Sequence, residues 1–333
     1  MKILTLYSPN IFVIHEKIDI GKLLMDFDQV GTLFVVTPSV YEKLSFLPKR
    51  GKLAGVFSFH QEDLDKEILD LVDTSRIIAI GASKVLDRAK YIASKLKVPL
   101  SVFPSILSTN AFSTERSVLK VKGKATSLIS KAPDSVYIVD SLLDMAPKGY
   151  NRFGLIDVFS IYTALADWDI AVSKGKATLA LEYYFAKSIL DTCLYSNLDM
   201  ENYYDVVKLL WHSGLVVGMY GDGRPESGSE HIIAKAIESK IDCFHVHSVS
   251  FGMLVAMKLQ GTWREDIVKL IVDISDWGSE YGKQTLKQIE DHLLSEDIHF
   301  RLGRYTVLDM VDGVRIQNMI NEVIEYLRHD LRL

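Results

Sequence analysis

Short apolar runs alternate with amphipathic stretches over residues 1–150. Helical patterns, in which apolar positions recur every three or four residues, begin at Ser39, Gln61 and Ser83. Continuous apolar strands separated by such helices are typical of a parallel sheet that helices cover. The pattern therefore predicts an α/β domain at the start of the chain. The apolar runs expected to form its strands are residues 31–37, 53–59, 76–81, 100–105 and 135–140.

The pattern changes at residues 145–152. This stretch, MAPKGYNR, combines proline, glycine and asparagine and is a natural boundary between domains. Beyond it, helical periodicity dominates and strand signals are scarce, so we expect domains at 1–148 and 149–333, the second of them all-α. The expected helices lie at residues 155–172, 177–195, 203–220, 229–240 and 248–260, with three more before the end of the chain.

Composition narrows the class of protein further. The net charge of −5 provides no large basic surface, which argues against nucleic acid as a partner. Two cysteines are too few for a disulfide framework or a thiolate zinc site, and are expected to be buried small hydrophobes. Residues 1–17 favour a strand, a turn at Ser8–Asn10 and a second strand rather than a signal peptide. No apolar run reaches the roughly 18 residues typical of a transmembrane helix. The sequence thus predicts a cytoplasmic protein that binds a small molecule, and it allows a homo-oligomer.

One junction suggests a phosphate site. The apolar run 76–81 ends at Gly81, and Ala82 and Ser83 then open an amphipathic helix. Free backbone N–H groups and the helix dipole favour phosphate at such a position. A single glycine without GxGxxG spacing is also compatible with an ordinary strand-to-helix turn, so both interpretations stay open at this point.

A second group of residues suggests a metal site. Three of the nine histidines cluster at His231, His245 and His247, each expected near the start of a helix. Asp157 interrupts a mostly apolar stretch, and a buried carboxylate needs a partner such as a cation. Two imidazoles and one carboxylate suit zinc, iron or nickel and leave coordination positions for a substrate. Isolated histidines near helix starts are more often structural, so the residues alone leave this site open.

The loop before His231 carries helix-start signals. Ser227 or Ser229 is expected to cap the helix, with Glu230 and His231 in its first turn. Arg224 lies earlier in the same loop, and either a substrate contact or a role in ordering the loop fits it.

Four segments, in order along the chain, resemble one superfamily. GASKVLDRAKYIA (81–93) is similar to its pyrophosphate-binding turn, and PSILSTNAFS (104–113) to its segment beside the nicotinamide. The stretch 145–168 resembles the segment that carries the family's metal-binding aspartate, and GRPESGSEHIIAKAIE (223–238) resembles its second metal-binding block. The family is that of iron-containing alcohol dehydrogenase, glycerol dehydrogenase and dehydroquinate synthase, with the glycerol-1-phosphate dehydrogenase branch the most similar.

The resemblance implies a dehydroquinate synthase-like fold, in which a Rossmann-like parallel sheet precedes a helical domain. It also implies a metal ion, zinc first and nickel or iron as alternatives, held by Asp157, His231 and His245. His245 is favoured over His247 because Gly252 and Gly261 then fall at the family's offsets; His247 becomes a substrate neighbour or alternate ligand. The implied contacts to NAD(P) are Gly81, Ala82, Ser83, Asp87, Ser105 and Ser108.

The implied chemistry is reduction of dihydroxyacetone phosphate to sn-glycerol 1-phosphate, a step of phospholipid biosynthesis. The implied catalytic set is Asp157, His231, His245 and Asn110, and the implied substrate contacts are Asn110, Arg224, Ser227 and His247. Asn110 stands where polyol-using members carry an aspartate, and Ala82 and Ser83 replace two glycines. Three alternatives therefore remain: a polyol or alcohol dehydrogenase, a dehydroquinate synthase-like enzyme, and a member that has lost turnover. The expected partner is a small phosphorylated or polyol substrate.

Overall fold

The computed structural model describes residues 9–14, 18–44, 46–55, 58–196, 198–298 and 303–330. These residues form two compact units. The first contains the described residues up to Arg152 together with residues 199–218, and the second contains residues 153–198 and the described residues from 219 onward. The predicted fold class, a parallel α/β domain followed by a helical domain, is confirmed.

A six-stranded parallel sheet forms the centre of the first unit, in the order β1-β8-β5-β4-β2-β3. Strands β2 and β4 are buried along almost their whole length because helices cover both faces. The strand expected before Ser8 lies outside the described residues. The strands of this sheet are β1 (Asn10–Ile14), β2 (Thr32–Val36), β3 (Lys52–Gly55), β4 (Arg76–Gly81), β5 (Leu100–Pro104) and β8 (Ser135–Val139).

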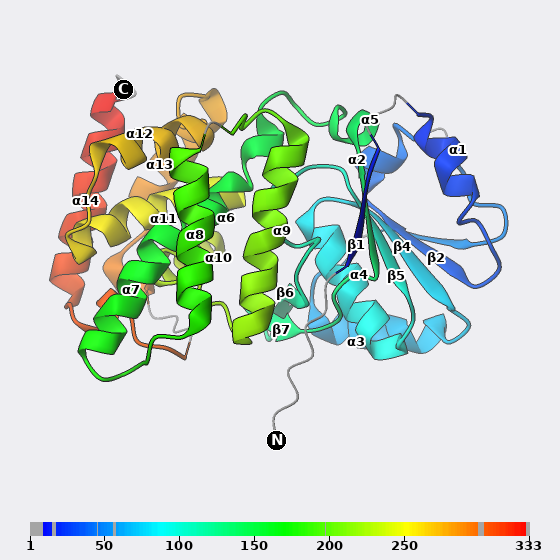
Figure 1. Ribbon diagram of the computed structural model, residues 1–333, viewed down its shortest axis with the longest axis horizontal. Helices are drawn as coiled ribbons and strands as arrows, with labels where there is room; N and C mark the ends of the chain where they lie inside the picture. The colour runs from blue at the N-terminus through cyan, green and yellow to red at the C-terminus, as the bar shows by residue number, and fades with distance from the viewer. Residues whose placement is uncertain are drawn as a thin grey trace. The chain divides into compact units, whose positions relative to one another are not determined.

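Side chains alternate between the two faces of β4. Ile78 and Ile80 pack into an apolar core with Leu24 of α1, and α4 packs against β4 and β5. Figure 1 shows the parallel strands with helices beside them. The helices of this unit are α1 (Ile20–Met25), α2 (Pro38–Tyr41), α3 (Gln61–Ile68), α4 (Ser83–Leu96) and α5 (Asp140–Leu143), with 3₁₀ turns η1 (Leu69–Leu71) and η2 (Tyr150–Arg152).

Two further elements of the first unit differ from the sequence-based expectation. An antiparallel hairpin of β6 (Arg116–Val121) and β7 (Lys124–Ile129), which the apolar pattern did not predict, packs against α4. The helix expected at 203–220 forms with those bounds as α9 (Tyr203–Tyr220), and its residues up to Gly218 belong to the first unit.

The second unit is helical, as expected. Helix α11 is buried from Val246 to Met257 and packs against α7, α10 and α14. Gly252 permits the close approach of α10, because a Cβ there would lie 2.3 Å from the backbone oxygen of Glu230. The elements are α6 (Leu155–Phe159), α7 (Ile161–Ser173), α8 (Leu181–Tyr195), α10 (Ser229–Lys240), α11 (His245–Gln260), α12 (Glu265–Ile274), α13 (Glu280–His292), η3 (Ser295–Asp297), η4 (Val307–Asp309) and α14 (Gly313–Asp330).

Two helix boundaries in this unit correct the sequence-based expectation. The helix expected at 155–172 is divided at Ser160, whose hydroxyl donates to the backbone oxygens of Asp157 and Glu226. Helix α11 begins at His245 rather than at residue 248, so the histidine pair lies inside its first turn. Within the described residues, no helix has the length and apolar character needed to cross a membrane.

Candidate metal centre and nucleotide-binding turn

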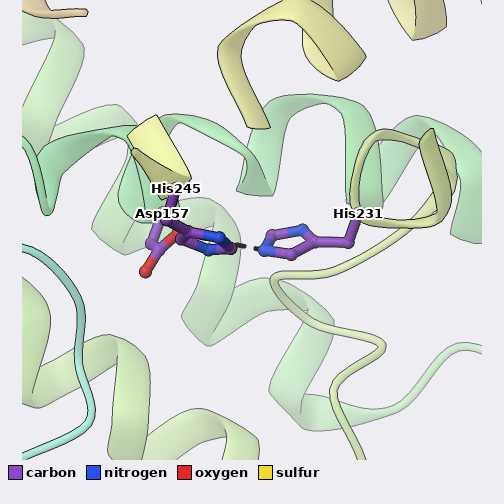
Figure 2. Close-up of side chains that lie close together, drawn as sticks. All are labelled: Asp157, His231 and His245. Atoms are coloured by element: carbon purple, nitrogen blue, oxygen red, sulfur yellow. Dashed lines mark ion pairs between the residues drawn. The ribbon is translucent and has the colours of Figure 1, made fainter. Parts of the chain in front are cut away.

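Three side chains from three helices meet in the second unit. Asp157 lies on α6, His231 in the first turn of α10 and His245 at the first position of α11. Figure 2 shows the His231 ring directed at the other two side chains. One ligand atom from each residue lies within 4.8 Å of the others. The Nε2 atoms of His231 and His245 are 3.8 and 3.6 Å from Oδ1 of Asp157.

A carboxylate lies behind each imidazole. Nδ1 of His231 is 2.8 Å from Oε1 of Glu230, and Nδ1 of His245 is 2.7 Å from Oε1 of Glu238. A carboxylate on Nδ1 selects the tautomer with its proton there, which leaves the Nε2 lone pair for a metal ion. Both rings are thus oriented with Nε2 toward Asp157.

The charges around His245 are strongly coupled. Burial lowers the pKa of His245, but the carboxylates of Glu238 and Asp157 outweigh burial and hold that pKa well above its ordinary value. Burial in turn raises the pKa of Glu238, and the charge and hydrogen bond of His245, with the Ser248 hydroxyl, bring that pKa below its ordinary value. The surroundings therefore favour positive charge between these carboxylates.

The side chains fit a divalent cation. Oδ1 of Asp157 is buried and has no hydrogen-bond partner, which is costly for a carboxylate oxygen unless a cation satisfies it. Two imidazole nitrogens and one carboxylate oxygen form a common donor set for zinc and related ions with open coordination positions. Asp157, His231 and His245 are therefore the residues of the second unit that could hold a metal.

A buried acidic pair shapes the loop before His231. The start of α10 corrects the expectation that Ser227 or Ser229 caps it: Gly228 is the N-cap, and it has no side-chain cap. Asp167 of α7 instead accepts from the Ser229 amide at 2.6 Å, and Glu230 accepts from the Gly228 amide. Burial, followed by the charge of Glu230, raises the pKa of Asp167 to about 6.

His247 lies apart from this metal centre. It is buried, and its ring contacts Trp277, Phe244 and Tyr281, with centroid distances of 4.9, 6.1 and 5.6 Å. Burial lowers the pKa of His247 to about 4, so the ring is neutral at physiological pH. Its surroundings resemble those of a core aromatic side chain.

The loop residues Arg224 and Ser227 lie in the same unit as the metal centre. The Arg224 side chain is 7% exposed and its guanidinium lies 6.0 Å from the centre of the Trp168 ring. The backbone oxygen of Ser227 accepts a hydrogen bond from Arg304. Sequence reasoning missed Glu238, although its spacing of seven residues from His231 places both side chains on one face of α10.

The candidate nucleotide-binding turn lies in the first unit, after β4. Gly81 has φ +155°, and a Cβ there would lie 2.9 Å from Cγ2 of Val85. Ala82 is the N-cap of α4 without a side-chain cap, so no side chain occupies the free amides of the first turn. The hydroxyl of Ser83 is 3.1 Å from that of Ser108 and 2.7 Å from that of Thr109, which brings two predicted cofactor contacts together.

The sheet order gives this turn further significance. The chain leaves β2 for β3 at one edge and returns to β4 on the other side of β2. Ligands of open parallel sheets bind at the carboxyl ends of strands where the order reverses in this way. Gly81 is the last residue of β4 and therefore lies at that position.

The remaining predicted residues of the first unit have protein partners. Asp87 is 2.9 Å from the Lys90 ammonium and accepts from the Val118 amide at 3.0 Å, so it fastens the β6 strand to α4. The Ser105 amide donates to the Gly81 oxygen at 3.1 Å. Asn110 is buried and its amide nitrogen donates to the Ser213 hydroxyl of α9 at 3.3 Å.

The chain is similar to known proteins in sequence and in fold. A family model described as iron-containing alcohol dehydrogenase matches residues 58–147. Glycerol-1-phosphate dehydrogenase (NAD(P)+) of Methanosarcina barkeri is 28% identical over 313 residues, 87% of each chain, and that of Methanosphaera stadtmanae is 27% identical over 74% of each. The crystal structure of a probable glycerol dehydrogenase from Sinorhizobium meliloti superposes with a TM-score of 0.67 at 15% identity, covering 97% of this chain and 99% of that one, a likeness of fold.

Proposed function

The chain belongs to the superfamily of iron-containing alcohol dehydrogenases and glycerol dehydrogenases, and we propose that it reduces dihydroxyacetone phosphate to sn-glycerol 1-phosphate with NAD(P)H. Membership of this family makes it an NAD(P)-linked oxidoreductase. The observation that carries the proposal is the candidate metal centre: a buried Asp157 oxygen without a hydrogen bond faces two imidazoles whose other nitrogens are fixed by carboxylates. The curated relatives, named for this reaction, support the choice of substrate.

Asp157, His231 and His245 would hold the metal ion, which when bound supplies Lewis-acid polarisation of the substrate's carbonyl oxygen. Glu230 and Glu238 hold the two imidazoles as Nε2 donors, so that neither ring must change tautomer when the substrate enters. When bound, the nicotinamide cofactor would supply hydride to the carbonyl carbon, and the resulting alkoxide would take a proton from water to give the alcohol.

The cofactor's pyrophosphate is assigned to the first turn of α4. The free amides at Ala82 and Ser83 and the N-terminal end of the helix dipole attract phosphate oxygens there. The hydroxyls of Ser83 and Ser108 add neutral donors, so binding does not depend on a lysine as in a P-loop. Ser105 and Asn110, which follow β5, are assigned to the nicotinamide end of the cofactor.

The proposal is tested by following NADH and NADPH oxidation at 340 nm with dihydroxyacetone phosphate, after loading with zinc, nickel or iron. We expect metal-dependent oxidation that Asp157→Ala reduces at least about 10³-fold, together with loss of bound metal, because one ligand of three is removed. Asp191→Ala is the matched control: it removes an exposed carboxylate that pairs with Lys187 on α8, and it should retain activity and metal. No oxidation with any metal and either cofactor would refute the proposal.

A polyol dehydrogenase is the second candidate. Asn110 is the residue that separates the two, because an amide hydrogen-bonds a hydroxyl but cannot accept its proton or carry charge. Oxidation of glycerol or another unphosphorylated diol at a kcat/KM above that for the phosphorylated substrate would favour this second function.

A further inference from the structure

A lysine without a partner lies on the same face of α10 as the metal ligand. Lys235 follows His231 by four residues, a spacing that brings two Cβ atoms to about 5–6 Å on a helix. Its side chain is half-buried, and within the described residues its ammonium has no hydrogen bond or ion pair. An ammonium that no protein group pairs is available to bind an anionic ligand.

Arg304 provides a second, independent observation. Its side chain is 9% exposed, and it donates to the Ser227 backbone oxygen and lies 3.4 Å from Oδ1 of Asp222. Its Nε atom is buried and has no partner. One guanidinium donor of Arg304 thus remains unused beside the loop that leads to His231.

The two cations lie close enough to affect each other. Burial, and then the charge of Arg304, lower the pKa of Lys235 below its ordinary value. Burial is also the main reason that the pKa of Arg304 is lowered, and Arg224 adds to this effect. Lys235, Arg304 and Arg224 therefore lie near one another, and the carboxylates of Asp222, Glu230, Asp167 and Glu238 also act on this group.

We propose that Lys235 and Arg304 form the subsite that holds the phosphate group of the substrate. The identity of this ligand rests on the proposed function; the anion subsite itself rests on the two unpartnered donors. A phosphate monoester carries up to two negative charges and three acceptor oxygens, which suits an ammonium and a guanidinium together. In dihydroxyacetone phosphate three bonds separate the carbonyl carbon from phosphorus. The spacing of Lys235 from His231 matches a substrate of that length, with its carbonyl at the metal ligands.

This assignment gives a reason for substrate choice. A dihydroxyacetone molecule without phosphate would reach the metal ligands but leave Lys235 and Arg304 unsatisfied. The unphosphorylated analogue lacks the phosphate oxygens that would accept charge-assisted hydrogen bonds here, so the subsite favours the phosphorylated substrate.

The test compares wild type with Lys235→Gln in the zinc-loaded protein. Calorimetric titration with inorganic phosphate measures the subsite without turnover, and the KM values for dihydroxyacetone phosphate and dihydroxyacetone measure its part in substrate choice. Loss of one charge-assisted hydrogen bond should lower the affinity for phosphate about 10- to 100-fold. It should raise the KM of the phosphorylated substrate by a similar factor. The KM of dihydroxyacetone and the zinc content should not change.

Two further variants make the result specific. Lys235→Arg keeps a cation and should restore phosphate affinity to within about threefold of wild type. Lys269→Gln, an exposed lysine of α12, should leave phosphate affinity unchanged. Arg304→Gln should also weaken phosphate binding. Because this variant loses the contact with the Ser227 backbone oxygen as well, the result for Lys235→Gln decides the test.

Each outcome has one meaning. Equal phosphate affinity in wild type and Lys235→Gln overturns the subsite, whichever substrate the enzyme uses. Equally tight, Lys235-dependent binding of acetate overturns the assignment to phosphate. Lys235-dependent phosphate binding in a protein that does not reduce dihydroxyacetone phosphate supports the subsite and refutes the proposed function.

Discussion

Glu238 contacts His245, one of the three proposed metal ligands, and is proposed to orient it. Its carboxylate accepts from Nδ1 of His245 at 2.7 Å and from the Ser248 hydroxyl. Glu238→Gln keeps the shape but removes the charge that holds His245 in place. We expect the metal affinity to fall about 10- to 100-fold, measured by competition with a fluorescent zinc chelator.

The control for this prediction is Glu322→Gln on α14, an exposed carboxylate 3.2 Å from Lys258. It changes the net charge equally, and its zinc affinity should stay at the wild-type value. If Glu238→Gln bound zinc as tightly as wild type, Glu238 would have no part in orienting His245.

The residues at the metal centre could be predicted only in part. His245 and His247 look equivalent in sequence, but neighbours two apart on a helix point in nearly opposite directions, about 200° around the axis. Only His245 faces Asp157, and His247 packs against Trp277. The resemblance to a known family had favoured His245. The spacing of Glu238 from His231 places both on one face of α10, but the contact of Glu238 with His245 depends on how α10 packs against α11, which the sequence does not show.

Side chains of α7 hold the start of α10 in place, because Asp167 accepts from the Ser229 amide. Gly228 lies where an added Cβ would meet Oδ2 of Asp167 at 2.5 Å, Oε2 of Glu230 at 3.0 Å and Cα of Ala164 at 3.2 Å. Gly228→Ala must therefore displace the buried acidic pair. We expect the free energy of unfolding in urea to fall by about 1–3 kcal/mol, with weaker zinc binding because His231 follows three residues later.

Gly278→Ala is a suitable comparison for Gly228→Ala. Nothing lies within 4 Å of a Cβ at Gly278, in the same unit, and its backbone does not need a positive φ. This variant should match or slightly exceed the wild-type stability, since alanine restricts the unfolded chain. Equal unfolding curves for the two variants would show that Gly228 does not depend on close packing.

Elements with strong periodicity were predictable, and those with mixed patterns were not. The strands β2 and β4 are continuous apolar runs because both of their faces are covered. The hairpin β6–β7 mixes the two patterns, with Val118 and Ile129 exposed and Ser117 buried, and it turns at Lys122 and Gly123, which have φ of 50° and 78°. Its register depends on that turn and on packing against α4, which short polar strands do not reveal.

At the scale of the molecule, periodicity identifies a helix but not its partner. Helix α9 was predicted with its correct bounds, yet its residues up to Gly218 pack with the first unit. Gly214 approaches Ser113 there, with a Cβ position 2.2 Å from the serine hydroxyl. The apolar face of a helix shows that another element covers it, but not which one. Long-range contacts such as that of Gly214 with Ser113 decide which element that is.

Asp167 connects three distant segments of the second unit, so its ionisation should be visible in the stability of that whole unit. Its two oxygens accept from the amides of Ser229 and Val307, at 2.6 and 2.8 Å. Burial and the charge of Glu230 raise its pKa to about 6, so between pH 4 and 6 the folded chain holds a proton that the unfolded chain has lost. Stability from this group is therefore present below pH 4 and lost as the pH rises through 6.

The loss is on the order of 3 kcal/mol at full ionisation. Asp167→Asn cannot titrate, and its second oxygen becomes an amide nitrogen that cannot accept from an N–H, so we expect it to be less stable overall. The decisive quantity is how the difference in unfolding free energy between the two proteins changes with pH. With EDTA present, the free energy of urea unfolding of wild type minus that of Asp167→Asn should decrease from pH 4 to pH 7. A difference that is constant or increases with pH would mean that Asp167 stays ionised in the folded protein, satisfied by its two amide donors despite the neighbouring Glu230.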